Sequence, residues 1–209
     1  DECEQRLGHT PRDTQMAYSA MLGRLTDIPF TLQANHDEQL SYLTAAARAL
    51  PPANSVASLR QAQSTVEAAV ARWPEDAALW EQLGEIKQAQ GDFASASAAA
   101  QRSLDKVPSS ADCWQLYGIS LGQEGKYENA ISAFQHVFAL DPQAVWARQN
   151  LALCLDKLGR RDEAVIQLKR ALALKPNYGT GWLTLGQLYE ELGRTNDAEQ
   201  CFSTALTNR

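Results

Sequence analysis

Apolar and polar positions in the second half of the chain recur with the period of an α-helix. Between residues 77 and 89, Trp80 and its apolar neighbours keep helical spacing, and Gly91 ends the run. A second run extends over about residues 93–106. Pro108 stops it, because proline has no backbone N–H for a continuing helix. The pattern predicts two helices joined by a tight turn.

This helical pair repeats every 34 residues. Three columns keep that interval, formed by Pro74, Pro108, Pro142 and Pro176, by Gly91, Gly125, Gly159 and Gly193, and by Ala96, Ala130, Ala164 and Ala198. Three columns in one register predict four consecutive helix-turn-helix units, at residues 77–110, 111–144, 145–178 and 179–209.

The columns resemble the tetratricopeptide repeat, whose pattern is W-x2-L-G-x2-Y, then A-x3-F, then P. The second unit matches it at Trp114, Tyr117, Gly118, Leu121, Ala130, Phe134 and Pro142. The third unit departs from it, with Arg148 where Trp is usual. The resemblance implies an all-α fold, in which the repeats build an α-solenoid, a right-handed superhelix, behind N-terminal capping helices.

The register weakens upstream of residue 77. We interpret residues 35–76 as a degenerate capping pair, with helices at 36–50 and 56–72, because Asn35 begins an N-cap signature. Residues 1–34 are expected to form one helix and an extended connector. The chain should therefore hold about eleven helices.

Composition narrows the function further. The chain of 209 residues has a net charge of −6, which disfavours nucleic acid as a partner, and a hydrophobic content of 44%, which suits a packed core. No apolar run approaches the length of a membrane span, so we expect a soluble protein. It begins at Asp1 without Met, which suggests a processed chain or an excised fragment whose compartment stays unknown. The cysteines form no C-x-x-C, and Cys113, Cys154 and Cys201 are expected to be buried thiols.

One short motif raises the question of catalysis. Residues 118–122, GISLG, match the G-x-S-x-G nucleophile elbow of serine hydrolases. The elbow needs a strand-to-helix turn, whereas Ser120 falls in the middle of a predicted helix, and no histidine stands at a recognisable partner spacing. We therefore expect Ser120 to be a structural residue. The sequence predicts no enzyme, no cofactor and no metal site.

By resemblance, the first helix of each repeat lines a concave groove. We predict a non-catalytic interaction scaffold that binds a peptide or protein segment there, and the candidate contacts are Glu81, Glu85, Gln115, Ile119, Trp146, Gln149, Asn150, Leu153, Leu183 and Gln187. Acidic and apolar positions together favour a partner with apolar anchors and some basic character. Glu81 and Glu85 stand where some tetratricopeptide proteins carry a cationic clamp for chaperone C-termini, so we reject that partner class.

Three alternatives stay open. Trp146 either faces the groove or turns over to fill the place of the missing Trp at Arg148. The chain is either a scaffold in its own right or the non-catalytic C-terminal repeat region of a larger, hydrolase-type enzyme. Finally, Leu206 ends an apolar column that a following repeat would cover. Either another molecule covers it, most simply in a homodimer through the C-terminal edge or through a partner domain, or it is a tolerated exposed edge.

Overall fold

The computed structural model describes residues 56–207, and within that range the chain forms nine helices and no strand. The helices are α4 (Val56–Arg72), α5 (Ala77–Ala89), α6 (Phe93–Lys106), α7 (Ala111–Gln123), α8 (Tyr127–Leu140), α9 (Val145–Lys157), α10 (Arg161–Leu174), α11 (Gly179–Glu191) and α12 (Thr195–Thr207). The predicted all-α repeat solenoid is confirmed. The helices expected at 36–50 and within 1–34 lie outside the described residues.

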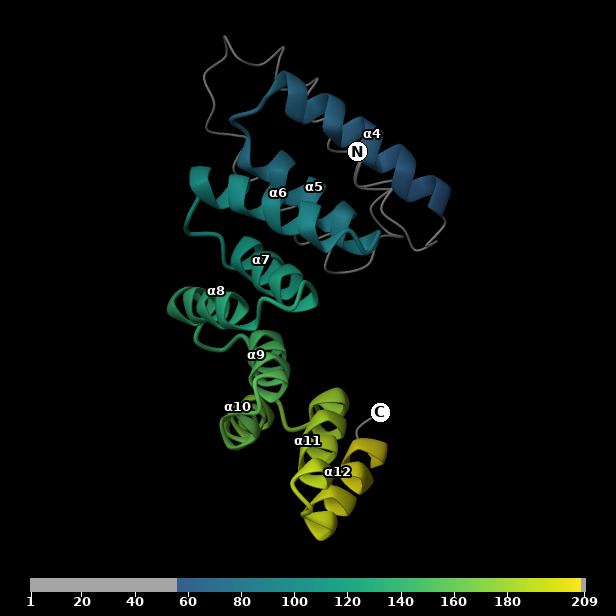
Figure 1. The fold of residues 1–209 in the computed structure, drawn as a ribbon, viewed down its shortest axis with the longest axis vertical. Coiled ribbons are helices and arrows are strands. Elements are labelled where there is room, and N and C mark those ends of the chain that lie inside the picture. Colours follow the sequence, from purple (N-terminus) through teal and green to yellow (C-terminus); the bar gives the residue numbers. More distant parts are fainter. Residues whose placement is uncertain (1–55, 208–209) are drawn as a thin grey trace, which may run out of the picture.

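The helical pairs stack into a curved array (Figure 1). Each helix packs mainly against the next one along the chain, so that α5 pairs with α6, α7 with α8, α9 with α10 and α11 with α12. In Figure 1, α8 and α10 lie on the outer side of the curve, while α7 and α9 lie nearer its inner side. The first helices of the central repeats therefore face the concavity.

A glycine closes the first helix of each repeat. Gly91 has a φ of 80°, a left-handed conformation that glycine adopts without steric cost. Its N–H donates to the Gln88 carbonyl at 2.9 Å, while the Asp92 N–H donates to the Lys87 carbonyl at 2.9 Å, which is the Schellman arrangement. The same pair of bonds follows α7, α9 and α11, so the glycine column is a column of helix ends.

The tryptophan column ties the first helix of each repeat to the loop before it. The indole N–H groups of Trp80, Trp114 and Trp182 each donate to the carbonyl of the preceding column proline at 2.8 Å. In the third repeat Arg148 Nη2 donates to the Pro142 carbonyl at 2.7 Å, so the guanidinium replaces the indole in this role. Trp146 stays 56% exposed, and the idea that it fills the missing place is wrong.

Small residues let the two helices of a repeat approach closely. A Cβ atom added to Gly186 would lie 2.5 Å from the Phe202 ring, and one added to Gly118 would lie 3.0 Å from the ring of Phe134. Phe134 is fully buried inside the second repeat, on α8. At these positions a glycine on the first helix leaves room for an aromatic ring on the second helix of the same repeat.

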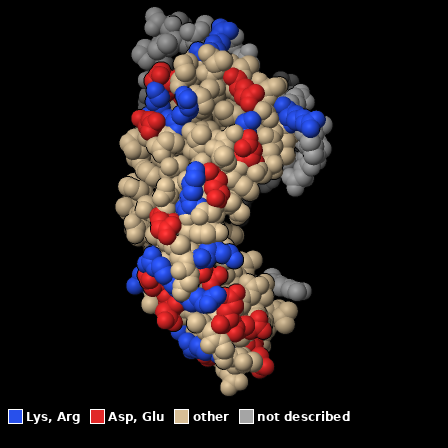
Figure 2. All heavy atoms as spheres, viewed as in Figure 1, with Lys and Arg blue, Asp and Glu red and all other residues tan. Residues whose placement is uncertain are grey.

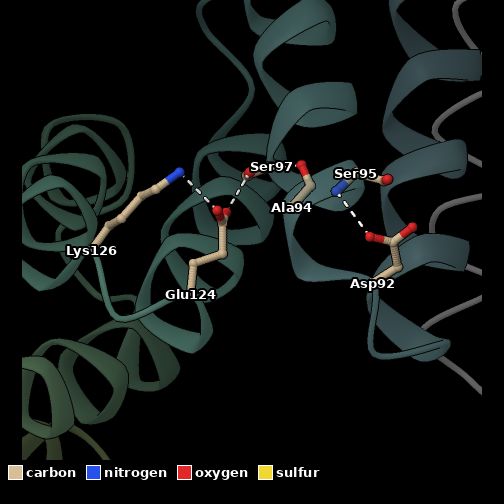
Figure 3. Close-up of polar contacts among 6 residues, drawn as sticks. All are labelled: Asp92, Ala94, Ser95, Ser97, Glu124 and Lys126. Carbon is tan, nitrogen blue, oxygen red and sulfur yellow. Dashed lines mark hydrogen bonds and ion pairs between the residues drawn. The ribbon is translucent and has the colours of Figure 1, made fainter.

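A polar contact joins the first repeat to the second (Figure 3). Ser97 on α6 donates to the Glu124 carboxylate at 2.5 Å, and Lys126 donates to the other oxygen of the same carboxylate at 2.7 Å. Burial alone would raise the pKa of Glu124, but the hydrogen bonds from Lys126 and Ser97 outweigh it and lower that pKa. The contact fixes the loop after α7 against the preceding helical pair.

Buried thiols complete the core as the sequence predicts. Cys113, Cys154 and Cys201 are free and buried, and burial raises the pKa of Cys113 to about 12 and that of Cys154 to about 11. They act as small apolar side chains. None of the helices between residues 56 and 207 is long and apolar enough to cross a membrane.

Candidate functional site

The first helices of the four repeats carry all ten candidate groove residues, and none of the ten is buried. α5 carries Glu81 and Glu85, α7 carries Gln115 and Ile119, α9 carries Trp146, Gln149, Asn150 and Leu153, and α11 carries Leu183 and Gln187. The inner surface of α5, α7, α9 and α11 is called the groove below.

The groove is acidic at the end formed by α5 and α7. Burial, together with the negative charges of Glu81 and Asp112, raises the pKa of Glu85 to about 7. The residue itself remains exposed by surface area, so protein surrounds its carboxylate on one side while water reaches it from the other. Three carboxyl groups from two repeats therefore act on one another here.

Farther along the groove an acidic position is already neutralised. Arg161 Nε lies 3.1 Å from Asp156 Oδ1 and 2.9 Å from Glu191 Oε2, and so bridges the third and fourth repeats. Asp156 thus contributes less negative charge to the groove than its sequence position suggests. On the face shown in Figure 2, acidic and basic side chains alternate over α9–α12 without a continuous basic stripe.

The other end of the groove is apolar and aromatic. The Trp146 ring meets the Tyr178 ring edge to face, with centroids 5.0 Å apart and planes at 76°. The Lys175 ammonium lies 5.7 Å from the first centroid and 5.6 Å from the second. A pocket of about 340 Å³ opens beside these rings, lined by Trp146, Tyr178, Gly179, Thr180, Leu183, Ala205 and Leu206, and is called the Trp146 pocket below.

Hydrogen bonds hold one wall of the Trp146 pocket in place. The Tyr178 hydroxyl donates to Gln149 Oε1, and Gln149 Nε2 donates to Thr184 Oγ1 at 3.0 Å. Both ends of the Gln149 amide are therefore used, one within the third repeat and one toward the fourth, so this candidate supports the groove more than it offers contacts to a ligand. Asn150 is half-buried at the same level of α9.

Sequence reasoning missed Tyr178 as part of the site. A signal was present, because Tyr178 occupies the N-cap column, where Asp76 and Ser110 accept hydrogen bonds from the first turns of α5 and α7. Tyr178 makes no such cap and is buried. A large ring at a capping position therefore indicates that the residue has another role, and here the Tyr178 ring lines the Trp146 pocket.

The GISLG motif is a helix segment, as predicted. Ser120 lies inside α7 with 0% of its surface exposed, and its hydroxyl has no hydrogen-bond partner among residues 56–207. A substrate cannot reach it without unfolding the repeat, so the elbow interpretation fails on geometry.

Comparisons with known proteins agree with this architecture. Family models described as tetratricopeptide repeat match residues 57–111, 82–143, 122–177 and 180–209. Among solved structures, MamA residues 41 to the end from Desulfovibrio magneticus RS-1 are 19% identical with a TM-score of 0.74, covering 82% of this chain and 95% of that one. A MamA structure from AMB-1 is 26% identical with a TM-score of 0.64, covering 82% of this chain and 92% of that one. A search of curated protein sequences returned no match.

Proposed function

The chain belongs to the tetratricopeptide repeat family and forms a protein-interaction scaffold, and from this premise we propose that its groove binds a segment of a partner protein. The scaffold has no catalytic role of its own in this proposal. The observation that carries it is the Trp146 pocket, in which exposed apolar side chains from three helices gather around one concavity.

The Trp146 pocket has the features of an anchor site. Trp146, Leu183 and Leu206 are 56%, 45% and 62% exposed, an unusual density of large apolar side chains for a solvated surface. Tryptophan and tyrosine dominate the binding energy of interfaces when they line a pocket, because they bury a large area at low entropic cost. A partner side chain of apolar character would fill this space.

The acidic positions of the groove determine which charge the rest of the partner segment should carry. The groove positions inferred from the repeat register include Glu81, Glu85 and Asp112 near one end, and none of these positions carries Lys or Arg. Complementary charge across an interface speeds association and excludes like-charged partners. A partner segment with basic residues over α5 and α7, and an apolar anchor toward α11, matches both ends of the groove.

Short synthetic peptides test this arrangement by fluorescence anisotropy. The set places lysines at one end and Trp, Phe or Leu at the other, with matched peptides in which Glu replaces Lys or Ser replaces the anchor. Trp146→Ala should weaken binding of the best peptide by about 1–3 kcal/mol, the range of an aromatic anchor. Glu85→Lys should weaken binding of the lysine peptides and leave the anchor preference intact.

Ile166→Ala is the matched control, because Ile166 is 48% exposed on α10 and lies outside the groove. It should leave peptide binding unchanged. The proposal is wrong if Trp146→Ala binds as the wild type does. It also loses its anchor if that variant sharply lowers the melting temperature, because Trp146 would then serve the core.

A further inference from the structure

A second pocket opens where the last repeat departs from the others. In the first two repeats, a planar side chain from the second helix covers the ring of the tryptophan column. The Arg102 guanidinium carbon lies 4.8 Å from the Trp80 ring centroid, and the His136 ring stacks on Trp114 with centroids 4.1 Å apart and planes at 15°. The third repeat has Arg170 at this position, close enough to add to the effect of burial in lowering the pKa of Arg148.

The fourth repeat has Thr204 at the covering position. Its hydroxyl donates to the Gln200 carbonyl at 2.8 Å, so the short side chain is folded against its own helix. Across residues 56–207, no ring and no cationic group stacks on Trp182, unlike Trp80 and Trp114. The space left is a pocket of about 460 Å³ bordered by α10, α11 and α12, called the Trp182 pocket below.

The Trp182 pocket is independent of the proposed groove site. It shares no lining residue with the Trp146 pocket. Its walls come from the indole of Trp182, the ring of Tyr189, and the aliphatic side chains of Leu172 and Leu185. Lys169 and Asp197 add charge at its border. Apolar and aromatic walls with a few polar groups are typical of ligand pockets of this size.

We propose that the Trp182 pocket binds an aromatic side chain presented by a partner protein. The ring stacks on the open Trp182 indole, as His136 stacks on Trp114, and supplies the cover that this repeat lacks. Offset or parallel ring pairs of this kind are favourable beyond the area they bury.

The charges around the Trp182 pocket select a neutral ring over a guanidinium. The Lys169 ammonium lies 5.8 Å from the Tyr189 ring centroid, and the Arg194 guanidinium carbon lies 4.4 Å from the same centroid. Arg194 Nη2 also forms an ion pair with Asp197 Oδ2 at 2.5 Å. Two cations thus lie beside the Tyr189 ring, and Asp197 is paired with Arg194. This positive charge repels an incoming guanidinium, whereas a neutral ring is not repelled.

Three probes separate the possible occupants of the pocket: N-acetyl-tryptophanamide, N-acetyl-leucinamide and N-acetyl-argininamide. Each is titrated into the ¹⁵N-labelled full chain, and the indole N–H signal of Trp182 is followed by nuclear magnetic resonance. The tryptophan probe should shift this signal to saturation at millimolar concentration. It should bind about 2- to 10-fold more tightly than the leucine probe, the advantage of one stacked ring pair. The arginine probe should bind more weakly than either.

Thr204→His fills the pocket in the way that His136 covers Trp114, and should abolish the shift of the Trp182 signal. Thr204→Ser leaves the pocket open and should bind as the wild type does. A urea unfolding curve for each variant confirms that the fold is intact. The proposal is overturned if the leucine or arginine probe binds best, if the Trp182 signal does not move, or if binding survives Thr204→His. A shift of the Trp146 signal reports on the groove alone, so the two proposals fail separately.

Discussion

Replacing Arg148 by Trp should stabilise the protein, even though Arg148 is well connected. Arg148 Nη2 donates to the Pro142 carbonyl at 2.7 Å, and its guanidinium carbon lies 4.7 Å from the Phe138 ring centroid. Its Nε is nevertheless buried without a hydrogen-bond partner in the described part of the chain, and burial together with the neighbouring Arg170 lowers the pKa of Arg148. A buried donor without a partner and a like charge nearby both oppose the folded state.

The expected change in stability follows from the contact that an indole would keep and the unfavourable groups that it would remove. In the other repeats the indole makes the same bond to the proline carbonyl at 2.8 Å, so Arg148→Trp preserves that contact. It eliminates the unpaired Nε, whose desolvation costs about 1–3 kcal/mol, and gives Arg170 a ring to stack on, worth about 0.5–1 kcal/mol. Allowing for strain when a larger side chain enters the third repeat, we expect a net gain of about 1 kcal/mol. That gain should raise the melting temperature by about 2–4 °C.

Urea unfolding followed by circular dichroism measures the effect, and hydrogen exchange of α9 amides localises it. Arg148→Leu is the matched control, because it supplies apolar bulk without a donor and leaves the Pro142 carbonyl unpaired. It should be about 1 kcal/mol less stable than Arg148→Trp. The reasoning would be refuted if Arg148→Trp unfolds at a lower urea concentration than the wild type. It would also be refuted if the Trp and Leu variants unfold at the same urea concentration.

Four further outcomes can be measured. Ser120→Ala should unfold at the same or a higher urea concentration, because it removes a buried hydroxyl without a partner, and a fluorophosphonate probe should leave the wild-type Ser120 unlabelled. Stability should fall as pH rises from 4.5 to about 7, since folded Glu85 holds its proton longer than the unfolded chain does; Glu85→Gln should remove this part of the pH profile. Gly186→Ala should destabilise the chain by about 1–3 kcal/mol through contact with Phe202, and Phe202→Leu in the same chain should recover part of the loss, whereas equal stability of Gly186→Ala and wild type would contradict the packing argument. Sedimentation at micromolar concentration should show a dimer that Leu206→Glu dissociates, and a monomer unaffected by this change would exclude the C-terminal edge as the interface.

The candidate site was predictable only in part. Position within a repeat indicated that Leu183 is accessible, because helical geometry places it on the exposed face of its helix, but it left open whether Trp146 faces outward or fills the place of the missing Trp. The same register could not show that Asp156 is neutralised by Arg161, or that Gln149 is held by Tyr178. Both bonds lie within the third repeat, and Arg161 and Gln149 also bond to Glu191 and Thr184 of the fourth repeat, so these contacts depend on how the helices are packed.

The sequence by itself determined the repeat and the ends of its helices. Gly91 and its equivalents adopt positive φ because only glycine does so at little cost, and the column prolines stop the second helices because they lack a donor. These are local properties of the backbone, so they recur wherever the residues recur.

Only the tertiary structure decided where the pattern is used differently. Arg148 adopts the hydrogen bond of an indole, Tyr178 lines a pocket instead of capping a helix, and within residues 56–207 no ring or cation stacks on Trp182 as His136 does on Trp114. Each change depends on side-chain length and on neighbours contributed by another helix. A column of residue types does not contain those distances, so they emerge only when the helices are packed.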